Sequence, residues 1–557
     1  MNNKTKQLFT TFGTYGLFLF LSVFSIYWVW LKGPTYFNGD DLAFHLARIE
    51  GLSQSISSGE FLPRINYFLA EGMGYPTGIF YPELFLYPAA ILRYFGFSVV
   101  TSYQLYLILL NFITFVIAYN CFYSVNKSKW GALLFSVIYG LSSYRMSDVL
   151  YRAAIGESLA FLFFPLVYVG IYQIIYGDKK KWWILAIGMT GLVYSHPLSA
   201  LLTCIFLLVY CLISIRPLFK DRSRLLRLVL ATGAAALLSV DVYLPMLEQV
   251  LFQRLRMQDV SMFYLAKEAQ SIGEYLSIAY NNIGYNNIGI LIPIGLLIGL
   301  IYLKKESKEN RRLLFIAILF FFLATSYFPH ALFHGTFFNA IQFPWRYFLI
   351  VTFLVCWFVA DSLVKVNKLT FKTRTTLIGL LLLLTIGLNL QNQLQLNKFR
   401  PTTAKQFEQL DGNSLGYGKE FLPSGMEAWT TPTSLLSEPQ DHVEITNMSR
   451  NSNAFFLHYN VSSSTRLIYP ILYYKGYVAE VNGTEKAVED AESYKGTNMH
   501  GLVQVTVKGK GTVLVWYKGT IIQKVSRWIS LVSLMLFFFY IVILPKVTNH
   551  KDNNQRT

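Results

Sequence analysis

The sequence predicts a mainly α-helical, polytopic membrane protein with about twelve transmembrane helices and a small β-sandwich-like domain near the C-terminus. Of its 557 residues, 54% are hydrophobic and only 14% are charged, whereas soluble domains are usually about one quarter charged. Residues 8–31 contain no charged side chain, and a helix needs about 20 apolar residues to cross the hydrocarbon core of a bilayer. The mean hydropathy of +0.40 agrees with this. The bilayer is therefore the main solvent that we expect for this chain.

Apolar runs place the helices along the chain. The first run is too long for the apolar core of a cleaved signal peptide, so we expect it to remain as a helix. Several later runs are short for a crossing. The twelve predicted spans cover residues 8–31, 99–125, 131–143, 157–176, 182–195, 198–214, 226–245, 287–303, 313–326, 347–364, 374–390 and 526–545.

The net charge of +17 is explained by the orientation of these spans. With the N-terminus inside, the cytoplasmic loops include the basic segments "GDKKKW", "RPLFKDRSRLLR" and "KKESKENRR". Such enrichment in short inner loops is the positive-inside pattern. It makes the basic charge a topology signal, with no nucleic acid implied. We expect a multi-pass protein of the cell membrane with both termini in the cytoplasm.

The spans divide the chain into three parts. Residues 1–390 form the predicted transmembrane core, with a first outer loop at 32–84. Residues 391–523 are polar and form the predicted extracytoplasmic β-rich domain, and residues 524–557 contain the final transmembrane helix and a cytoplasmic tail. Within the β-rich part, "LVQVTVKGKGTVLVWYKG" predicts a hairpin with its turn at 508–511, and Asn482-Gly483 predicts another turn.

Ionisable residues follow the first span directly, in "FNGDDLAFHLARIEGL". If this segment is helical, Asp41, His45 and Arg48 share one face. Asp40 lies a quarter turn away and, taken alone, fits a helix cap. An acid, an imidazole and a guanidinium on one strip at the edge of the bilayer point instead to a functional site.

Other polar residues fall at the same, outer ends of the predicted spans. Singly, each has a structural explanation, such as an i, i+3 ion pair, a helix cap or an interfacial anchor. Together they predict one polar chamber at the outer leaflet, because ionisable groups near lipid usually face a cavity or one another. These residues are Arg145, Asp148, Arg152, Glu157, His196, Asp241, Gln342 and Arg346.

The sequence leaves the cofactor open. Asp40 and Asp41 can ligate Mg²⁺ or Mn²⁺ through oxygen, but two carboxylates make an incomplete shell. His330 and His334 have metal-ligand spacing without a nearby acidic partner, which is a weak signal for zinc.

Four stretches carry a resemblance to a known family: "DLAFHLARIEGL", "GYPTGIFYPELFLYPAAILRYFGFS", "YRAAIGESLAF" and "QFPWRY". They resemble a bacterial polytopic family labelled 6-pyruvoyl-tetrahydropterin-synthase-related membrane proteins, close to the YfhO-like proteins, over residues 37–350. Nothing here resembles the histidine cluster of that soluble synthase. The family is similar to the glycosyltransferase C architecture, in which an acidic residue just after the first helix is the catalytic base or a metal-site acid. Asp41 matches the pattern Asp-x-x-x-His-x-x-Arg, and Asp40, the additional acid, is the second catalytic candidate.

The resemblance implies an integral membrane glycosyltransferase that moves a sugar from a polyprenyl-phosphate donor to an extracytoplasmic acceptor, such as a cell-wall or lipid-linked glycopolymer. Asp41 would act as the base of an inverting single displacement. Arg145, Arg152 and Arg346 would bind the lipid phosphate, and His45 and Arg48 would orient Asp41 or hold the sugar. Asp148, Glu157, His196 and Gln342 are the further candidates for substrate binding.

Two other kinds of function stay open. A transporter or lipid flippase places its binding groups near the middle of the membrane, on broken helices in repeated halves. The sequence contains no internal repeat, and its ionisable residues gather at one set of helix ends. A non-catalytic scaffold that presents the β-rich domain for cell-surface assembly is the third possibility.

Overall fold

The chain divides by its contacts into two compact units, each built from three segments. The computed structural model describes residues 3–33, 35–259, 264–365, 370–399, 401–408, 410, 412–416, 418–426, 434–440, 443–451 and 453–543. The predicted cytoplasmic tail after residue 543 lies outside this range. Unit 1 comprises Met1–His45, Ser98–Ala236 and Phe263–Gln409, and unit 2 comprises Leu46–Phe97, Leu237–Met262 and Leu410–Thr557.

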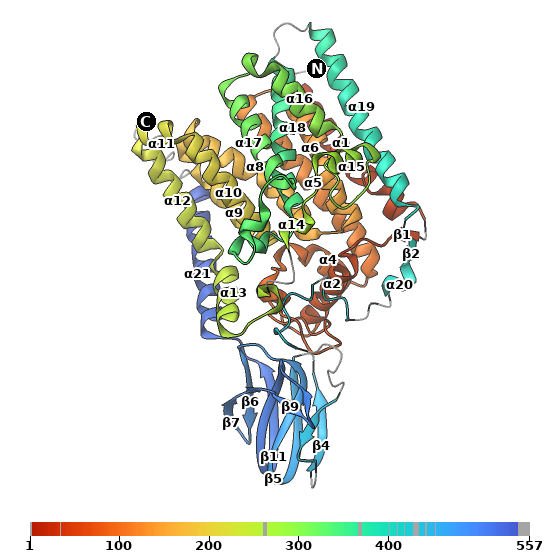
Figure 1. Cartoon of the computed structure of the whole chain (residues 1–557), viewed down its shortest axis with the longest axis vertical. Helices are drawn as coiled ribbons and strands as arrows, with labels where there is room; N and C mark the ends of the chain where they lie inside the picture. The colour runs from red at the N-terminus through yellow and green to blue at the C-terminus, as the bar shows by residue number, and fades with distance from the viewer. Residues whose placement is uncertain are drawn as a thin grey trace. The chain divides into compact units, whose positions relative to one another are not determined.

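Unit 1 is mostly helical (Figure 1). Short strands β1 and β2 pair in antiparallel fashion within it, and helices α2 and α12 continue from it into unit 2. Its elements are α1 (Asn3–Phe24), η1 (Tyr27–Leu31), β1 (Thr35–Phe37), the start of α2 (Leu42–Ser57), α5 (Val99–Asn126), α6 (Lys129–Gly140), α7 (Ser143–Met146), η3 (Ser147–Tyr151), α8 (Ile155–Ile175), η4 (Lys179–Trp182), α9 (Trp183–Ser195), α10 (Pro197–Ile213), α11 (Ile215–Lys220), α12 (Arg222–Leu238), α14 (Leu265–Glu268), α15 (Ile272–Asn281), α16 (Leu291–Tyr302), η6 (Leu303–Lys305), α17 (Lys308–Ala324), η7 (His330–Phe333), η8 (Phe337–Ile341), η9 (Pro344–Tyr347), α18 (Phe348–Lys365), α19 (Phe371–Leu396), β2 (Pro401–Thr403) and α20 (Ala404–Glu408).

Helices α6, α8 and α18 form the core of unit 1 around buried aromatic rings. The Trp357 ring of α18 lies 5.1 Å from the Phe135 ring of α6 and 4.7 Å from the Tyr168 ring of α8. Helix α9 packs against α8 at a glycine, because a Cβ atom at Gly170 would lie only 2.3 Å from the backbone nitrogen of Leu185. Small residues at such contacts are typical of helix pairs in membranes. This aromatic core packs α6, α8 and α18 against one another.

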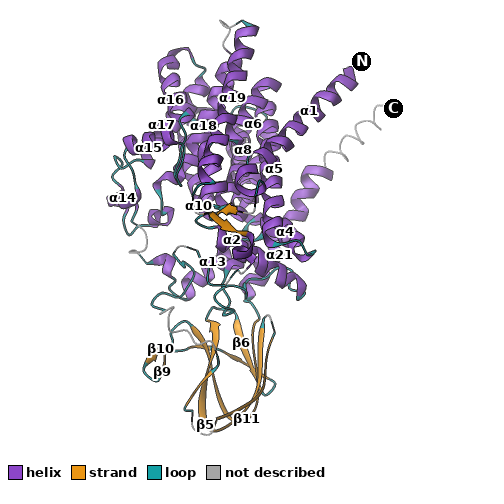
Figure 2. Ribbon diagram, turned by 90° about the vertical axis from the view of Figure 1, so that its right-hand side faces the viewer, coloured by secondary structure: helices purple, strands orange, loops and turns teal. Residues whose placement is uncertain are grey.

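Unit 2 combines helices with a β-sheet (Figure 2). Strand β5 pairs with β3, β4 and β11, and the sheet order is β3-β5-β11-β6-β7, with β8 paired to β11. The elements of unit 2 are the rest of α2, α3 (Thr77–Phe80), η2 (Leu84–Leu86), α4 (Tyr87–Tyr94), α13 (Val240–Phe252), η5 (Arg256–Gln258), β3 (Leu436–Glu438), β4 (Val443–Arg450), β5 (Ala454–Leu472), β6 (Tyr477–Val481), β7 (Thr484–Ala487), β8 (Glu489–Asp490), β9 (Ser493–Tyr494), β10 (Thr497–Asn498), β11 (Leu502–Tyr517), α21 (Ile521–Phe538) and η10 (Phe539–Ile543).

The C-terminal sheet confirms the predicted β character and corrects one turn. The turn at Asn482-Gly483 joins β6 to β7, with Val481 opposite Thr484. The predicted turn at 508–511 is wrong, because β11 continues through it as one strand paired with β5. A register shift between Val507 and Gly509 takes up the glycine-rich stretch as an irregularity in the ladder. The sandwich-like arrangement of this sheet stays a prediction.

All twelve predicted spans overlap helices, but fewer of the described helices are long and apolar enough to cross a membrane. Helices α6, α9 and α16 have 12 or 13 residues, which is about 18–20 Å at 1.5 Å per residue and less than the hydrocarbon thickness. Among the described residues, five helices are long and apolar enough to cross a membrane, or six if the bent pair α12 and α13 is one span. The five are α5, α8, η9 with α18, α19 and α21 with η10. The count of twelve is therefore not confirmed.

Candidate functional site: Asp41 beside a buried ion-pair network

The backbone that carries Asp41 is bonded directly to the segment before α8. The Asp40 N–H donates to the Tyr151 carbonyl at 3.3 Å, and the Asp41 N–H donates to the Arg152 carbonyl at 2.7 Å. This approach requires Gly39, since a Cβ atom there would lie 2.8 Å from Cβ of Ala153. The chain from β1 to α2 is thus fixed against residues 151–153 of the same unit.

The Asp41 carboxylate is half-buried at the start of α2, whereas Asp40 is exposed. Among the described residues it accepts no hydrogen bond and has no cation within 4.0 Å. Burial raises the pKa of Asp41, and the positive charge of Arg152 opposes that rise. A carboxylate in this state has spare acceptor capacity and an increased affinity for a proton. Such a group is suited to general-base chemistry.

Four charged side chains form a buried network in unit 1. Arg152 Nη1 donates to Asp148 Oδ1 at 2.6 Å and to Glu157 Oε2 at 2.8 Å. Arg346 Nε lies 3.7 Å from the same Glu157 oxygen, and the Tyr144 hydroxyl donates to Glu157 Oε1 at 2.6 Å. Asp148 and Glu157 are no more than 1% exposed, and the two arginines are each 7% exposed. The network pairs two arginines with two buried carboxyl groups, so that each guanidinium has a carboxyl partner.

The backbone is strained on both sides of this network. Ala153, next to Arg152, has φ +55°, and Gln342 has φ +64°, a region that side chains other than glycine seldom adopt. The Gln342 side chain accepts a hydrogen bond from Arg346 Nη1 at 2.6 Å, and the same nitrogen donates to the Ile341 carbonyl. Retained strain of this kind clusters at functional sites.

Two of the histidines in unit 1 are predicted site residues, His45 and His196. His196, at the junction of α9 and α10, is buried, and its Nδ1 lies 2.8 Å from the Ser199 hydroxyl. Burial, followed by the nearby Arg346 charge, lowers the pKa of His196 to about 3, so this imidazole is neutral at physiological pH. His45 is buried in the first turn of α2, where its N–H donates to the Asp41 carbonyl at 3.1 Å.

Arg145 is not part of the network. Its Nη1 donates to the Gly140 carbonyl, and its Nη2 donates to Asn111 Oδ1, both at 2.6 Å. Its other hydrogen bonds reach Met146 and Thr114. These contacts join the end of α6 to α5 in the fully buried interior, so Arg145 acts as a structural brace.

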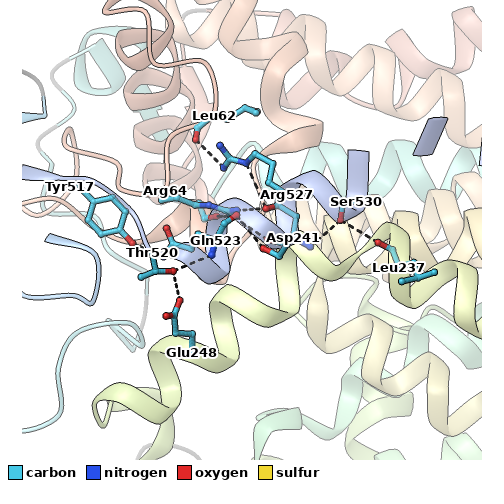
Figure 3. Close-up of polar contacts among 12 residues, drawn as sticks. Leu62, Arg64, Leu237, Asp241, Glu248, Tyr517, Thr520, Gln523, Arg527 and Ser530 are labelled. Atoms are coloured by element: carbon cyan, nitrogen blue, oxygen red, sulfur yellow. Dashed lines mark hydrogen bonds and ion pairs between the residues drawn. The ribbon is translucent and has the colours of Figure 1, made fainter. Parts of the chain in front are cut away.

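Arg48 and Asp241 belong to unit 2. Arg48 Nη2 donates to the carbonyls of Tyr81 and Pro82, at 2.8 and 3.2 Å. Asp241 forms ion pairs with Arg64 and with Arg527 of α21 (Figure 3). Arg48 and Asp241 thus have different partners within unit 2.

The acidic pair does not provide a complete metal site. Asp40 and Asp41 are adjacent in sequence but differ in exposure. The described part of the chain contains no group of three or more His, Cys, Asp or Glu residues that could hold a metal ion. Two carboxylates do not supply the six or more oxygen ligands that a divalent cation takes, unless water or substrate contributes most of them.

Sequence reasoning missed Gly39, Tyr144 and Ala153. Tyr144 is one of many tyrosines in the chain, and nothing in its local sequence marks it as a partner of Glu157. Nothing in the local sequence indicates the strained backbone at Ala153 either. Gly39 had a weak signal, because glycine is the residue that permits a close backbone approach.

Comparison with known proteins identifies the family. A family model described as bacterial membrane protein YfhO matches residues 75–407, which is more than half of the chain. The chain belongs to the YfhO family. An uncharacterized protein of Lactococcus lactis subsp. cremoris (strain MG1363) is 25% identical over 249 residues, which cover 43% of this YfhO-family chain and 40% of that protein. The chain thus matches less than half the length of this curated relative.

Two solved structures of Archaeoglobus fulgidus proteins are similar at a low level. One is an oligosaccharyltransferase tethered with an acceptor peptide, with 12% identity and a TM-score of 0.43, covering 76% of this chain and 62% of that chain. The other is the oligosaccharyltransferase AglB in complex with an inhibitory peptide and a dolichol-phosphate, with 13% identity and a TM-score of 0.40, covering 75% and 62%. Scores this low assign neither fold nor activity to the YfhO-family chain.

Proposed function

We propose that this YfhO-family protein is an integral membrane glycosyltransferase that uses a polyprenyl-phosphate-linked sugar outside the cytoplasm. One observation carries the proposal. The half-buried Asp41 carboxylate has no hydrogen-bond partner among the described residues, and it is fixed through its backbone to Arg152, whose side chain belongs to a buried network. A poised base and a nearby guanidinium are the two groups that inverting sugar transfer from a phosphate needs.

In the proposed step, Asp41 accepts the proton of an acceptor hydroxyl while that oxygen attacks the anomeric carbon. The bond between the anomeric carbon and the phosphate oxygen breaks, and the electron pair leaves with the lipid phosphate. The new glycosidic bond forms on the opposite face of the sugar, so the configuration inverts. Guanidinium groups stabilise the negative charge that develops on the leaving phosphate.

Arg152 is the first candidate for contact with the phosphate. It uses only Nη1 for Asp148 and Glu157, and its Nε and Nη2 donors make no hydrogen bond with any described residue. Two adjacent guanidinium donors match two phosphate oxygens. Arg346 Nε lies 3.7 Å from the Glu157 oxygen that Arg152 binds, and it adds positive charge. Asp148 and Glu157 then hold the arginines, while His45 and Gln342 position the neighbouring groups.

A lipid-linked donor follows from the proposed location. Nucleotide sugars stay in the cytoplasm. A transferase that works outside the cytoplasm therefore needs a donor sugar that is attached to a membrane lipid. The family is one of bacterial membrane proteins, and the chain has several helices that can span a bilayer. The acceptor is then an extracytoplasmic glycan or glycopolymer, with the C-terminal sheet as a candidate surface for its binding.

The pH profile of transfer should reflect the raised pKa of Asp41. Only the deprotonated carboxylate can accept a proton, so activity falls as the pH drops through the pKa of this group. Because burial raises that pKa, the acid limb of kcat/KM should lie above about pH 4, the usual value for aspartate. Initial rates between pH 4 and 8 measure it. A limb at or below the usual value would contradict the assigned role.

Mass spectrometry of lipid-linked and wall glycans tests the function itself. Cells that lack the protein should lose one sugar substituent from an envelope polymer and accumulate the corresponding polyprenyl-phosphate sugar. Cells that carry the wild-type gene again should recover both. Unchanged glycans and unchanged lipid intermediates in the deleted strain would exclude sugar transfer.

One observation favours transport as the second candidate. Helices α12 and α13 are interrupted at Ser239, and Asp241 follows the interruption; broken helices of this kind form the binding sites of transporters. In proteoliposomes that contain a lipid-linked sugar, an enzyme forms a glycosylated acceptor, whereas a flippase only moves the lipid between leaflets.

A further inference from the structure

Helix α21 begins with two cations and an indole on one face. Lys524, Arg527 and Trp528 are spaced i, i+3 and i+4, so their side chains project from the same side of the helix. Lys524 and Trp528 are exposed, and the Lys524 ammonium makes no hydrogen bond or ion pair with any described residue. Helix α21 with η10 is one of the helices that can span a membrane.

Arg527 is held in place by groups of unit 2 (Figure 3). Its Nε lies 3.7 Å from Asp241 Oδ1, and its Nη2 donates to the Leu62 carbonyl at 3.4 Å. Asp241 is already paired with Arg64, whose Nη1 donates to the Asp241 carbonyl at 3.1 Å. Ser530 of α21 accepts from the Asp241 N–H at 3.1 Å. The Arg527 guanidinium is therefore positioned in advance, although its side chain remains 31% exposed.

The local charge is positive. Arg64, Arg527 and Lys524 contribute three cations, and Asp241 contributes one anion. Glu60 also interacts electrostatically with Arg527, but burial raises the pKa of Glu60, which favours its neutral form. Glu248 is paired with Lys475 and accepts a hydrogen bond from Thr520. One or two positive charges thus remain for an anionic ligand.

Exposed apolar side chains occur on the same helix and in the loop whose Leu62 carbonyl contacts Arg527. Trp528 is 67% exposed, and Phe61 and Leu62, in the loop after α2 of the same unit, are 64% and 50% exposed. Farther along the same face of α21, Leu531 and Met535 are also exposed. Aromatic residues and basic residues at the start of an apolar helix mark the headgroup level of a bilayer. An isolated soluble anion would not require this apolar surround.

We propose that Lys524 and Arg527 form a binding site for the phosphate of an anionic phospholipid, with Trp528 and Phe61 packed against its acyl region. The site would fix the start of α21 at the membrane surface, directly after strand β11 of the sheet. Basic side chains attract anionic headgroups by about fivefold in affinity each. This inference does not depend on sugar transfer, because it rests on unit 2 alone.

Native mass spectrometry of the full chain, released from nanodiscs containing phosphatidylglycerol or phosphatidylcholine, tests the site. The wild-type protein should retain phosphatidylglycerol in preference to phosphatidylcholine. The double variant K524Q/R527Q should lose this preference by about 25-fold, and K524Q alone, which leaves the Asp241 contacts intact, by about fivefold. The matched control K508Q/K510Q removes two exposed lysine charges from β11 and should bind as the wild type does.

The contrary results are distinct. Equal retention of the two lipids by the wild type, or equal losses in the control and in K524Q/R527Q, would show general charge attraction and overturn the site. Displacement of phosphatidylglycerol by millimolar inorganic phosphate would show a phosphate site without lipid recognition and would also overturn it. Retention by K524Q at the wild-type level would remove Lys524 from the site and leave a single arginine, which contradicts the proposal.

Discussion

The variant Asp41→Asn is expected to lower sugar transfer by about 10²–10⁴-fold, the usual contribution of a general base. Asparagine has nearly the same size as aspartate and leaves the backbone N–H of residue 41 bonded to the Arg152 carbonyl, but its amide cannot accept the proton of the acceptor hydroxyl. The loss should appear in kcat, with KM for the lipid donor changed by no more than a few-fold. The measurement is transfer from a polyprenyl-phosphate sugar in membranes or detergent.

Asp40→Asn is the matched control. It removes the same charge one residue earlier, from a side chain that is exposed, so transfer should stay within about threefold of the wild type. If both variants lose activity equally, transfer depends on the local negative charge, and the assignment of Asp41 as the general base is wrong. If Asp41→Asn retains full activity, the mechanism proposed for this site is wrong.

The helical path of the chain could be predicted from the sequence because apolar runs and helix breakers are local signals. The segment from residue 42 is helical as expected, and all twelve apolar runs became helices. Whether a helix crosses a bilayer depends on its final length and on the helices packed against it. The hydropathy pattern predicts neither of these. The predicted turn at 508–511 failed for a similar reason. Strand β5 is long enough to pair with β11 on both sides of the glycines. This pairing depends on tertiary structure and is not visible in the local sequence.

The site could be predicted only in part. Asp148, Arg152 and Glu157 lie close together in sequence and are paired in the structure. Arg346 and its partner Gln342 were found because they are polar residues at the end of an apolar run. Arg145 shows the limit of this reasoning, because its neighbours in sequence are site residues while its side chain turns toward Asn111 on α5. Helical spacing alone does not decide which way a side chain points when the helix is only four residues long.

The same network should dominate the stability of unit 1. Arg152→Met removes the cation that Asp148 and Glu157 share while leaving both carboxylates buried. Removing one partner of a buried ion pair costs about 3–5 kcal/mol, a large part of the roughly 5–15 kcal/mol that stabilises a typical protein. Thermal unfolding in detergent should therefore show a strongly lowered midpoint, or the variant should fail to accumulate in membranes.

Three companion variants separate charge compensation from packing. Arg466→Met makes the same substitution at the half-exposed pair with Glu438 and should cost about 1 kcal/mol or less. Asp148→Asn should cost little, because one of its carboxylate oxygens has no hydrogen-bond partner and burial raises the pKa of Asp148. The double variant Arg152→Met with Glu157→Gln should recover part of the stability lost in Arg152→Met, since it removes one of the stranded charges. If the double variant is less stable than Arg152→Met alone, packing of the Arg152 side chain matters more than its charge.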